Sequence, residues 1–315
     1  MMHANQKRKG FTLLELVIVI VIFGIVASLG AEIVSNLYNN YMRSRAINAL
    51  QTQTEITLEQ IAKRLQYRIK DSVRIRKQGG AWISLGDPTA TKEYNTIEWI
   101  GISNESFLGD YNGTEYIPGW SGLLDMDHNN TRFATRTLET SGSRLDFTEN
   151  IIASLTNNDI NMSNEAGQLP VLIFKAPKPL YNVNNYYSQG GGNYTVRVSR
   201  VAGINTRFHI PADDNLTDGT LYEQYYLSHT AYTLDLVNTG VNDFNLTLHY
   251  NYQPWQNERF NDANTPRSVL AEHVSTFRIA QDESGVIRIK LCLHDNNQSI
   301  ASDFDFGACK EKVIY

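Results

Sequence analysis

Residues 7–31 read KRKGFTLLELVIVIVIFGIVASLGA, and this stretch decides how the rest of the chain is organised. Three basic residues precede about twenty residues in which Glu15 is the only charge. At about 1.5 Å per residue, a helix over residues 11–31 spans the roughly 30 Å hydrocarbon core of a bilayer. The positive charge before it places the N-terminus in the cytoplasm and the remainder of the chain across the membrane.

Two ordinary explanations compete for this apolar segment. It can be a cleaved secretory signal, with Ser28-Leu29-Gly30 as a small-x-small cleavage site, or a simple uncleaved anchor. Neither accounts for Glu15, because a carboxylate costs about 2.5–3.5 kcal/mol at the centre of a bilayer and somewhat less near its edge. An ionisable residue in a membrane segment therefore indicates a function. The alternative is that the Glu15 side chain only extends toward the cytoplasmic headgroups.

The segment from Lys7 to Gly10, followed by Phe11-Thr12-Leu13-Leu14-Glu15, resembles the leader and cleavage site of the type IV prepilin and pseudopilin superfamily. The resemblance implies that a prepilin peptidase cuts after Gly10 and that the new amino terminus, Phe11, is methylated. Glycine before the cut gives a protease close access to the backbone. The resemblance also implies that Glu15 neutralises the cationic amino terminus of a neighbouring subunit during filament assembly, an attraction that low dielectric strengthens.

Charge divides the 315-residue chain into a basic stalk and an acidic body. The net charge of −5 combines +2 over residues 1–31, +5 over residues 32–78 and −12 over residues 79–315. An acidic body argues against nucleic acid as a partner. With 42% hydrophobic residues and two cysteines, the chain is neither disordered nor a cysteine-rich scaffold.

The stalk is predicted to be helical. Residues 31–78 contain neither Gly nor Pro, and Gly79-Gly80 follows. We expect one helix from about Phe11 to Lys77, whose second half packs an apolar stripe on the body and carries a basic outer face. The stripe is formed by Ile33, Leu37, Tyr41, Ile47, Leu50, Thr54, Leu58, Ile61, Leu65, Ile69 and Val73, and the basic face by Arg43, Arg45, Lys63, Arg64, Arg68, Lys70 and Arg74.

The body is predicted to be an antiparallel β-sheet, which makes the whole chain an α+β, pilin-like fold. Alternating apolar residues indicate strands, and Asp282 to Gly285 joins the last two as a hairpin. The segments 182–193 and 238–245 are expected to be loops. Strands are expected at 96–100, 143–147, 171–174, 194–201, 246–252, 274–279 and 286–293.

Cys292 and Cys309 lie outside the cytoplasm in this topology, so we expect a disulfide between them, with two unpaired thiols as the alternative. Such a bridge also resembles the C-terminal disulfide loop of type IV pilins. The large body and the pattern from Val269 to Ile289 look like PilW-type minor pilins and the J-type minor pseudopilins of type II secretion.

Sites for chemistry are few. Asp125, Asp127 and Asn129 have the spacing of the first three ligands of a calcium loop, but Asn130 and Arg136 replace its glycine and glutamate. Calcium is therefore a weak expectation, and a plain acidic turn is the alternative. The sequence has no H-E-x-x-H, G-x-S-x-G, C-x-x-C or phosphate-binding motif, so we predict a protein that is not an enzyme.

These features predict a minor pilin or pseudopilin that is held in the inner membrane with its body in the periplasm. It would then be assembled into a type IV pilus or a type II secretion pseudopilus, where it would act in initiation or at the tip. Its partners would be prepilin peptidase, other pilin subunits and the inner-membrane assembly platform. The alternative is a membrane-anchored periplasmic binding or enzymatic domain. The expected parts are a leader (1–10), a transmembrane half-helix (11–31), an amphipathic half-helix (32–78) and a β-rich body (79–315), taken as one domain.

Overall fold

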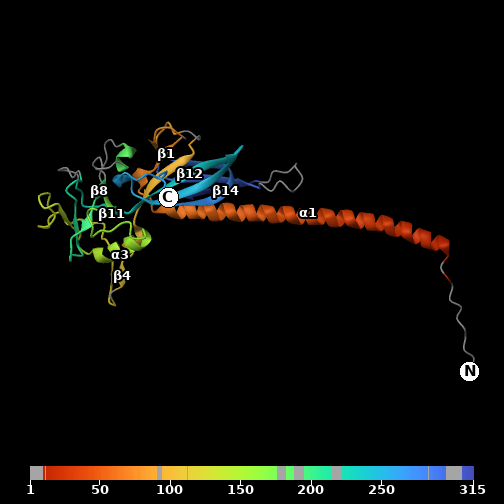
Figure 1. The fold of residues 1–315 in the computed structure, drawn as a ribbon, viewed down its shortest axis with the longest axis horizontal. Coiled ribbons are helices and arrows are strands. Elements are labelled where there is room, and N and C mark those ends of the chain that lie inside the picture. Colours follow the sequence, from red (N-terminus) through yellow and green to blue (C-terminus); the bar gives the residue numbers. More distant parts are fainter. Residues whose placement is uncertain are drawn as a thin grey trace, which may run out of the picture.

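The computed structural model describes residues 10, 12–77, 79–90, 94–111, 113–175, 182–187, 195–214, 221–282, 284–295 and 307–315. Figure 1 shows one long helix whose C-terminal part lies along a β-sheet, while its N-terminal part projects away from the body. A helix packed on an antiparallel sheet confirms the expected α+β class.

The long helix, α1, runs from Leu13 to Gln66, and its 54 residues are about 80 Å long. Thr12 is the N-cap residue, and its hydroxyl accepts a hydrogen bond from the Glu15 backbone amide. The helix passes through Gly24 and Gly30 without interruption.

The prediction that this helix continues to Lys77 is wrong, and the reason is tertiary pairing. After Gln66 the backbone turns onto the end of β3 (Thr96–Gly101): Ile69 N donates to Ile100 O at 2.9 Å, and Ile102 N donates to Tyr67 O at 2.7 Å. A short 3₁₀ helix (Lys70–Ser72) and strand β1 (Arg74–Arg76) follow, and β1 also pairs with β3. Because no Gly or Pro marks this end, propensity alone does not reveal it.

The main sheet has eight strands in the order β16-β15-β14-β13-β12-β3-β1-β2, all antiparallel to their neighbours. Strands β12 to β16 build its larger half, each pairing with the next one along the chain. The connections β12–β13 and β14–β15 are short turns, whereas β13–β14 and β15–β16 are joined by longer segments. The remaining strands are β2 (Ile83–Ser84), β12 (Thr230–Gly240), β13 (Asp243–Tyr252), β14 (Arg267–Gln281), β15 (Ile287–His294) and β16 (Gly307–Ile314).

The core of this layer lies between α1 and strands β14, β15 and β16. Leu58, Ile61 and Leu65 of α1 are buried in one cluster with Ile289 and Leu291 of β15. On α1 these positions belong to the predicted apolar stripe. On β15 they alternate along the strand and therefore lie on one face of the sheet. The N-terminal part of the stripe does not pack on the body, since Ile33, Leu37 and Tyr41 are exposed.

The distal part of the body lies beyond the C-terminal end of α1 (Figure 1) and has its own buried cluster, including Trp120, Leu138, Leu172 and Phe208. It contains two three-stranded sheets, a two-stranded hairpin and two helices. The elements are α2 (Asn104–Phe107), β4 (Asp110–Tyr111), β5 (Tyr116–Ile117), β6 (Thr137–Glu139), α3 (Leu145–Leu155), β7 (Val171–Phe174), β8 (Thr195–Arg197), β9 (Ser199–Arg200), β10 (Arg207–His209) and β11 (Tyr225–Ser228), with 3₁₀ turns at Val183–Tyr186 and Pro254–Gln256.

Three local predictions need correction. The segment 143–147 is not a strand, because Leu145, Thr148 and Ile152 form the buried side of α3 with helical spacing. The segment 238–245 is not a loop, since β12 and β13 continue into it and pair Gly240 with Asp243 across a two-residue turn. Of the predicted loop 182–193, Val183 and Tyr186 are buried in a 3₁₀ turn, while 188–193 lies outside the described residues.

A disulfide joins β15 to β16. Cys292 and Cys309 are directly opposite each other in the register, and their Cα atoms are 4.1 Å apart. The bridge fixes the last strand of the sheet, and this strand also carries contacts to α1.

Replacing Ile61 by Ala is expected to lower the free energy of unfolding by about 2–5 kcal/mol, because its side chain is only 1% exposed in the helix–sheet core. Ile56→Ala is the matched control, since Ile56 lies on the same helix and is 53% exposed; it should cost less than about 0.5 kcal/mol. Urea unfolding followed by tryptophan fluorescence of the full chain in detergent measures both. Equal losses would contradict the packing face of α1.

The double substitution Cys292→Ser and Cys309→Ser is expected to cost about 3 kcal/mol of stability, the typical effect of a bridge closing a loop of this size. Before reduction, the unfolded natural protein should not react with iodoacetamide; after reduction it should take up two equivalents, as measured by intact mass. Alkylation without reduction would show that the thiols are unpaired.

Candidate functional site

The start of α1 is built by a reciprocal pair of hydrogen bonds between Thr12 and Glu15. The Thr12 amide and hydroxyl donate to Glu15 Oε2 at 3.0 and 2.9 Å, and the Glu15 amide donates to the Thr12 hydroxyl at 3.4 Å. This is a capping box, in which residues N-cap and N3 satisfy each other's backbone amides. Helix α1 therefore begins three residues after Gly10.

The sequence contains the signal for this capping box, Thr-x-x-Glu before an apolar run. The interpretation of Glu15 only as the partner of a neighbouring amine does not predict the box. The structure gives the Glu15 carboxylate a local role as well. Gly10 is exposed and has open space around its Cα, whereas Phe11 and the leader residues 1–9 lie outside the described residues.

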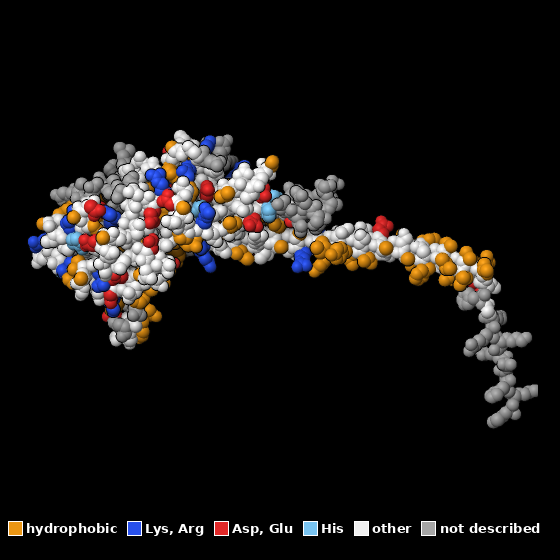
Figure 2. Space-filling view, in the orientation of Figure 1, with side chains coloured by type: hydrophobic (Ala, Val, Ile, Leu, Met, Phe, Trp, Pro, Cys, Tyr) orange, Lys and Arg blue, Asp and Glu red, His pale blue; other side chains and the backbone are white. Residues whose placement is uncertain are grey.

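The N-terminal part of α1 has no partner in its own chain among the described residues. Its large apolar side chains from Leu13 to Tyr41 are all exposed, and Figure 2 shows orange side chains in two groups along the projecting helix. The helix is long enough and apolar enough to cross a membrane. An apolar surface of this extent needs lipid or another protein to cover it.

The C-terminal part of α1 is held on the sheet by polar contacts at the edge of the packed core. Lys310 and Lys312 of β16 pair with Glu55 and Glu59 of α1, and the Thr57 hydroxyl donates to Leu270 O at 3.3 Å. The Lys310 hydrogen bond lowers the pKa of Glu55. These pairs set the register of the helix on β16, although exposed ion pairs contribute little stability.

Three residues of the predicted basic face lie beyond the end of α1 at Gln66. Lys70 is exposed in the short 3₁₀ helix, whereas Arg68 and Arg74 pair within the body. Arg68 is buried and donates to Leu65 O at 2.7 Å and to Gly285 O at 3.1 Å, at the turn between β14 and β15. Burial lowers the pKa of its guanidinium. Arg74 lies after the helix and pairs with Glu98 of β3. These corrections follow from the early end of α1.

A hollow of about 220 Å³ lies beside β1 and is lined by cations and aromatic rings. The Arg74 guanidinium stacks 4.3 Å from the Trp82 ring, and that of Arg76 lies 4.8 Å from the Phe260 ring. The described residues that line this hollow include the carboxylates of Glu98 and Glu258 and the phenol of Tyr187, but no Ser, Thr, Cys, His or Lys.

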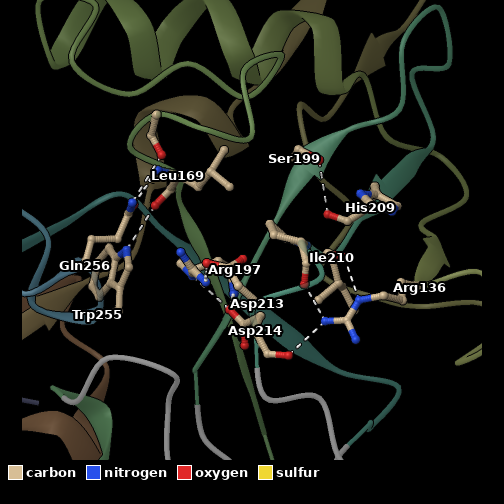
Figure 3. A network of polar contacts seen from close by, with 12 residues as sticks. Arg136, Leu169, Arg197, Ser199, His209, Ile210, Asp213, Asp214, Trp255 and Gln256 are labelled. Carbon is tan, nitrogen blue, oxygen red and sulfur yellow. Dashed lines mark hydrogen bonds and ion pairs between the residues drawn. The ribbon is translucent and has the colours of Figure 1, made fainter.

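The distal part of the body holds a buried ion-pair network, drawn in Figure 3. Arg197 binds Asp214 at 3.0 Å through Nε and Asp213 at 3.0 Å through its terminal nitrogen. The hydrogen bond from Arg197 lowers the pKa of Asp213. Arg136 donates to the carbonyls of Ile210 and Asp214, each at 2.9 Å. The network connects separate segments of the distal part, although Asp214 Oδ1 is buried without a hydrogen-bond partner and Asp213 is largely exposed.

The predicted calcium ligands lie in a turn before β6. Asn129 Oδ1 accepts a hydrogen bond from Arg132 at 3.1 Å, and the Asp125 carbonyl accepts one from the Thr131 hydroxyl at 2.6 Å. Within the part of the chain that the structure describes, Asp125 and Asp127 belong to no cluster of three or more ligands of the His, Cys, Asp and Glu types. Calcium binding by Asp125, Asp127 and Asn129 stays a prediction.

The family comparison agrees with the N-terminal geometry. Residues 5–31 match the family model described as the prokaryotic N-terminal methylation motif. No curated protein and no solved structure matches the chain. The matched residues contain Gly10, Phe11 and the capping box, and they lead directly into the exposed apolar part of α1. The motif, together with this helix, supports the resemblance to the type IV pilin and pseudopilin family.

Proposed function

We propose that this protein is a minor pilin or pseudopilin that helps to initiate a short filament or forms its tip. Prepilin peptidase cuts after Gly10 on the cytoplasmic side of the inner membrane, and Phe11 is then methylated. Residues 11–31 anchor the protein until the inner-membrane assembly platform moves it into a type IV pilus or a type II secretion pseudopilus. The observation that carries the proposal is the exposed apolar half of α1 directly after the methylation motif.

The size and place of the body support a terminal position. Its distal part lies beyond the C-terminal end of α1, on the side away from the membrane (Figure 1). In a fibre whose subunits stack along their helices, a subunit above would have to occupy the space next to this part. A subunit with nothing above it avoids that conflict, which favours the tip or the first subunit assembled.

Glu15 is proposed to pair with the cationic amino terminus of the next subunit. In the isolated chain its carboxylate is already bound by Thr12, so the local cap and the neighbouring amine draw on the same side chain. A carboxylate accepts about four hydrogen bonds. It is therefore able to keep the Thr12 contacts and accept the amine of a neighbour in the same geometry.

The mature protein is expected to begin with methylated Phe11. Intact-mass and N-terminal peptide analysis of the membrane-purified full chain measures this directly. In the control variant Gly10→Val, a β-branched side chain obstructs the peptide bond to be cut, so the chain should begin at Met1. A natural protein that begins at Met1, or after Gly30, would make residues 11–31 a plain anchor or a secretory signal.

Substituting Glu15 by Gln is expected to abolish incorporation into filaments while leaving the protein membrane-bound and folded. Gln retains the acceptor of the capping box but removes the charge that pairs with the amine. Thr12→Ala is the matched control, because it removes the cap and keeps the charge; it should lower the helix stability by about 1 kcal/mol and still assemble. Incorporation is measured in sheared filament fractions by immunoblotting.

The two variants separate the roles of Glu15. If Thr12→Ala stops assembly and Glu15→Gln does not, the box matters for helix geometry and the pairing proposal fails. If neither variant affects the protein's cellular activity, the alternative of a membrane-anchored periplasmic domain gains support.

A further inference from the structure

Asp243, His273 and His294 form a cluster on the main sheet that filament assembly does not require. Asp243 is the first residue of β13, His273 lies within β14, and His294 is the last residue of β15. The register brings them together, because Val274 pairs with Phe244 on one side and with Leu293 on the other. One ligand atom from each of the three residues lies within 4.8 Å of the other two.

The separations are close to those of a tetrahedral metal site. Ligands 2.0–2.1 Å from Zn²⁺ in tetrahedral geometry are about 3.3 Å apart. His273 Nδ1 is 3.3 Å from each Asp243 oxygen, and His294 Nε2 is 3.8 Å from Asp243 Oδ1. Small side-chain rotations bring all three donors to one cation.

The backbone of β14 is distorted at this point in a way that presents His273 to Asp243. His273 has a φ of 56°, the left-handed region that side chains other than glycine adopt at a cost of about 1–3 kcal/mol. The β13–β14 register shifts next to it, and the β14–β15 register shifts between Val274 and Thr276. Bulges of this kind re-aim a side chain, and they are enriched next to functional sites.

His294 lacks a hydrogen bond on both ring nitrogens within the described part of the chain. Its Nδ1 is buried without a partner, and its Nε2 is 3.8 Å from the nearest carboxylate oxygen, beyond hydrogen-bond distance. A cation bound at Nε2 would give that nitrogen a partner. The three side chains are half-buried, so a cation from solvent can reach them.

We propose that Asp243, His273 and His294 bind one divalent transition-metal ion, for which Zn²⁺ fits best. Two imidazoles and one carboxylate suit Zn²⁺ and do not suit Ca²⁺ or Mg²⁺, which take oxygen ligands. Three protein ligands leave the fourth position to water or to a group from a neighbouring subunit. The ion joins β13, β14 and β15 two residues from Cys292, whose disulfide joins β15 to β16.

The test uses the full chain in detergent, without a polyhistidine tag, stripped with EDTA and dialysed against ZnCl₂. Mass spectrometry of the metal content should find one zinc per chain. At a free zinc concentration 100-fold above Kd, the melting temperature should rise by about 5 °C relative to the EDTA-treated protein. Asp243→Asn, His273→Asn and His294→Phe should each weaken zinc binding at least about 100-fold. Asn is used at 273 because it tolerates positive φ.

The matched control is His209→Ala. His209 also pairs with a carboxylate, Glu165, but no described residue of the His, Cys, Asp or Glu types completes a third ligand there. This variant should still bind one zinc. The proposal is overturned if the natural protein retains no zinc, or if His294→Phe retains as much as the natural protein. Melting of every variant in EDTA identifies any that has not folded. If His294→Phe does not fold, the zinc content of the isosteric Asp243→Asn variant decides whether the cluster binds the metal.

Discussion

The structure depends on an apolar helix surface that no other described part of the chain covers. From Leu13 to Tyr41 the large side chains of α1 face outward, and at about 25 cal/mol per Å² this surface is a strong driving force for insertion or association. The body neither folds back onto it nor needs it, since the packed core begins near Leu50 and ends at Leu65. The two halves of one helix therefore serve two environments.

The body is attached to α1 by two sets of contacts, and both would transmit a force between the helix and the body. Within the C-terminal part of α1, Glu55 and Glu59 bind the last strand of the sheet. At its end, the buried Arg68 donates to the turn between β14 and β15, and the backbone after Gln66 pairs with β3. Rotation of the body about the helix axis would break all of these contacts together. The helix and the sheet are thus expected to move as one body.

The sequence was sufficient to predict features that local chemistry specifies. The apolar run with Glu15, the alternation at 287–293 and the turn at Asp282 to Gly285 each follow from residue type and spacing. Features set by distant residues were missed. Helix α1 ends where β3 offers hydrogen bonds, and Arg68 is buried because Gly285, 217 residues later, accepts from it. The Asp243, His273 and His294 cluster needs the strand register, which spacing along the chain does not contain.

The capping box is compatible with the proposal that Glu15 serves both folding and assembly. A carboxylate alone at the head of an apolar helix is costly in lipid, and the amide and hydroxyl of Thr12 offset part of that cost within the same subunit. In the proposed assembly, the amine of a neighbouring subunit would meet a carboxylate that is already held in place, so that little side-chain entropy would be lost when the pair forms. On this proposal Thr12 positions the carboxylate, and the charge of Glu15 selects the partner.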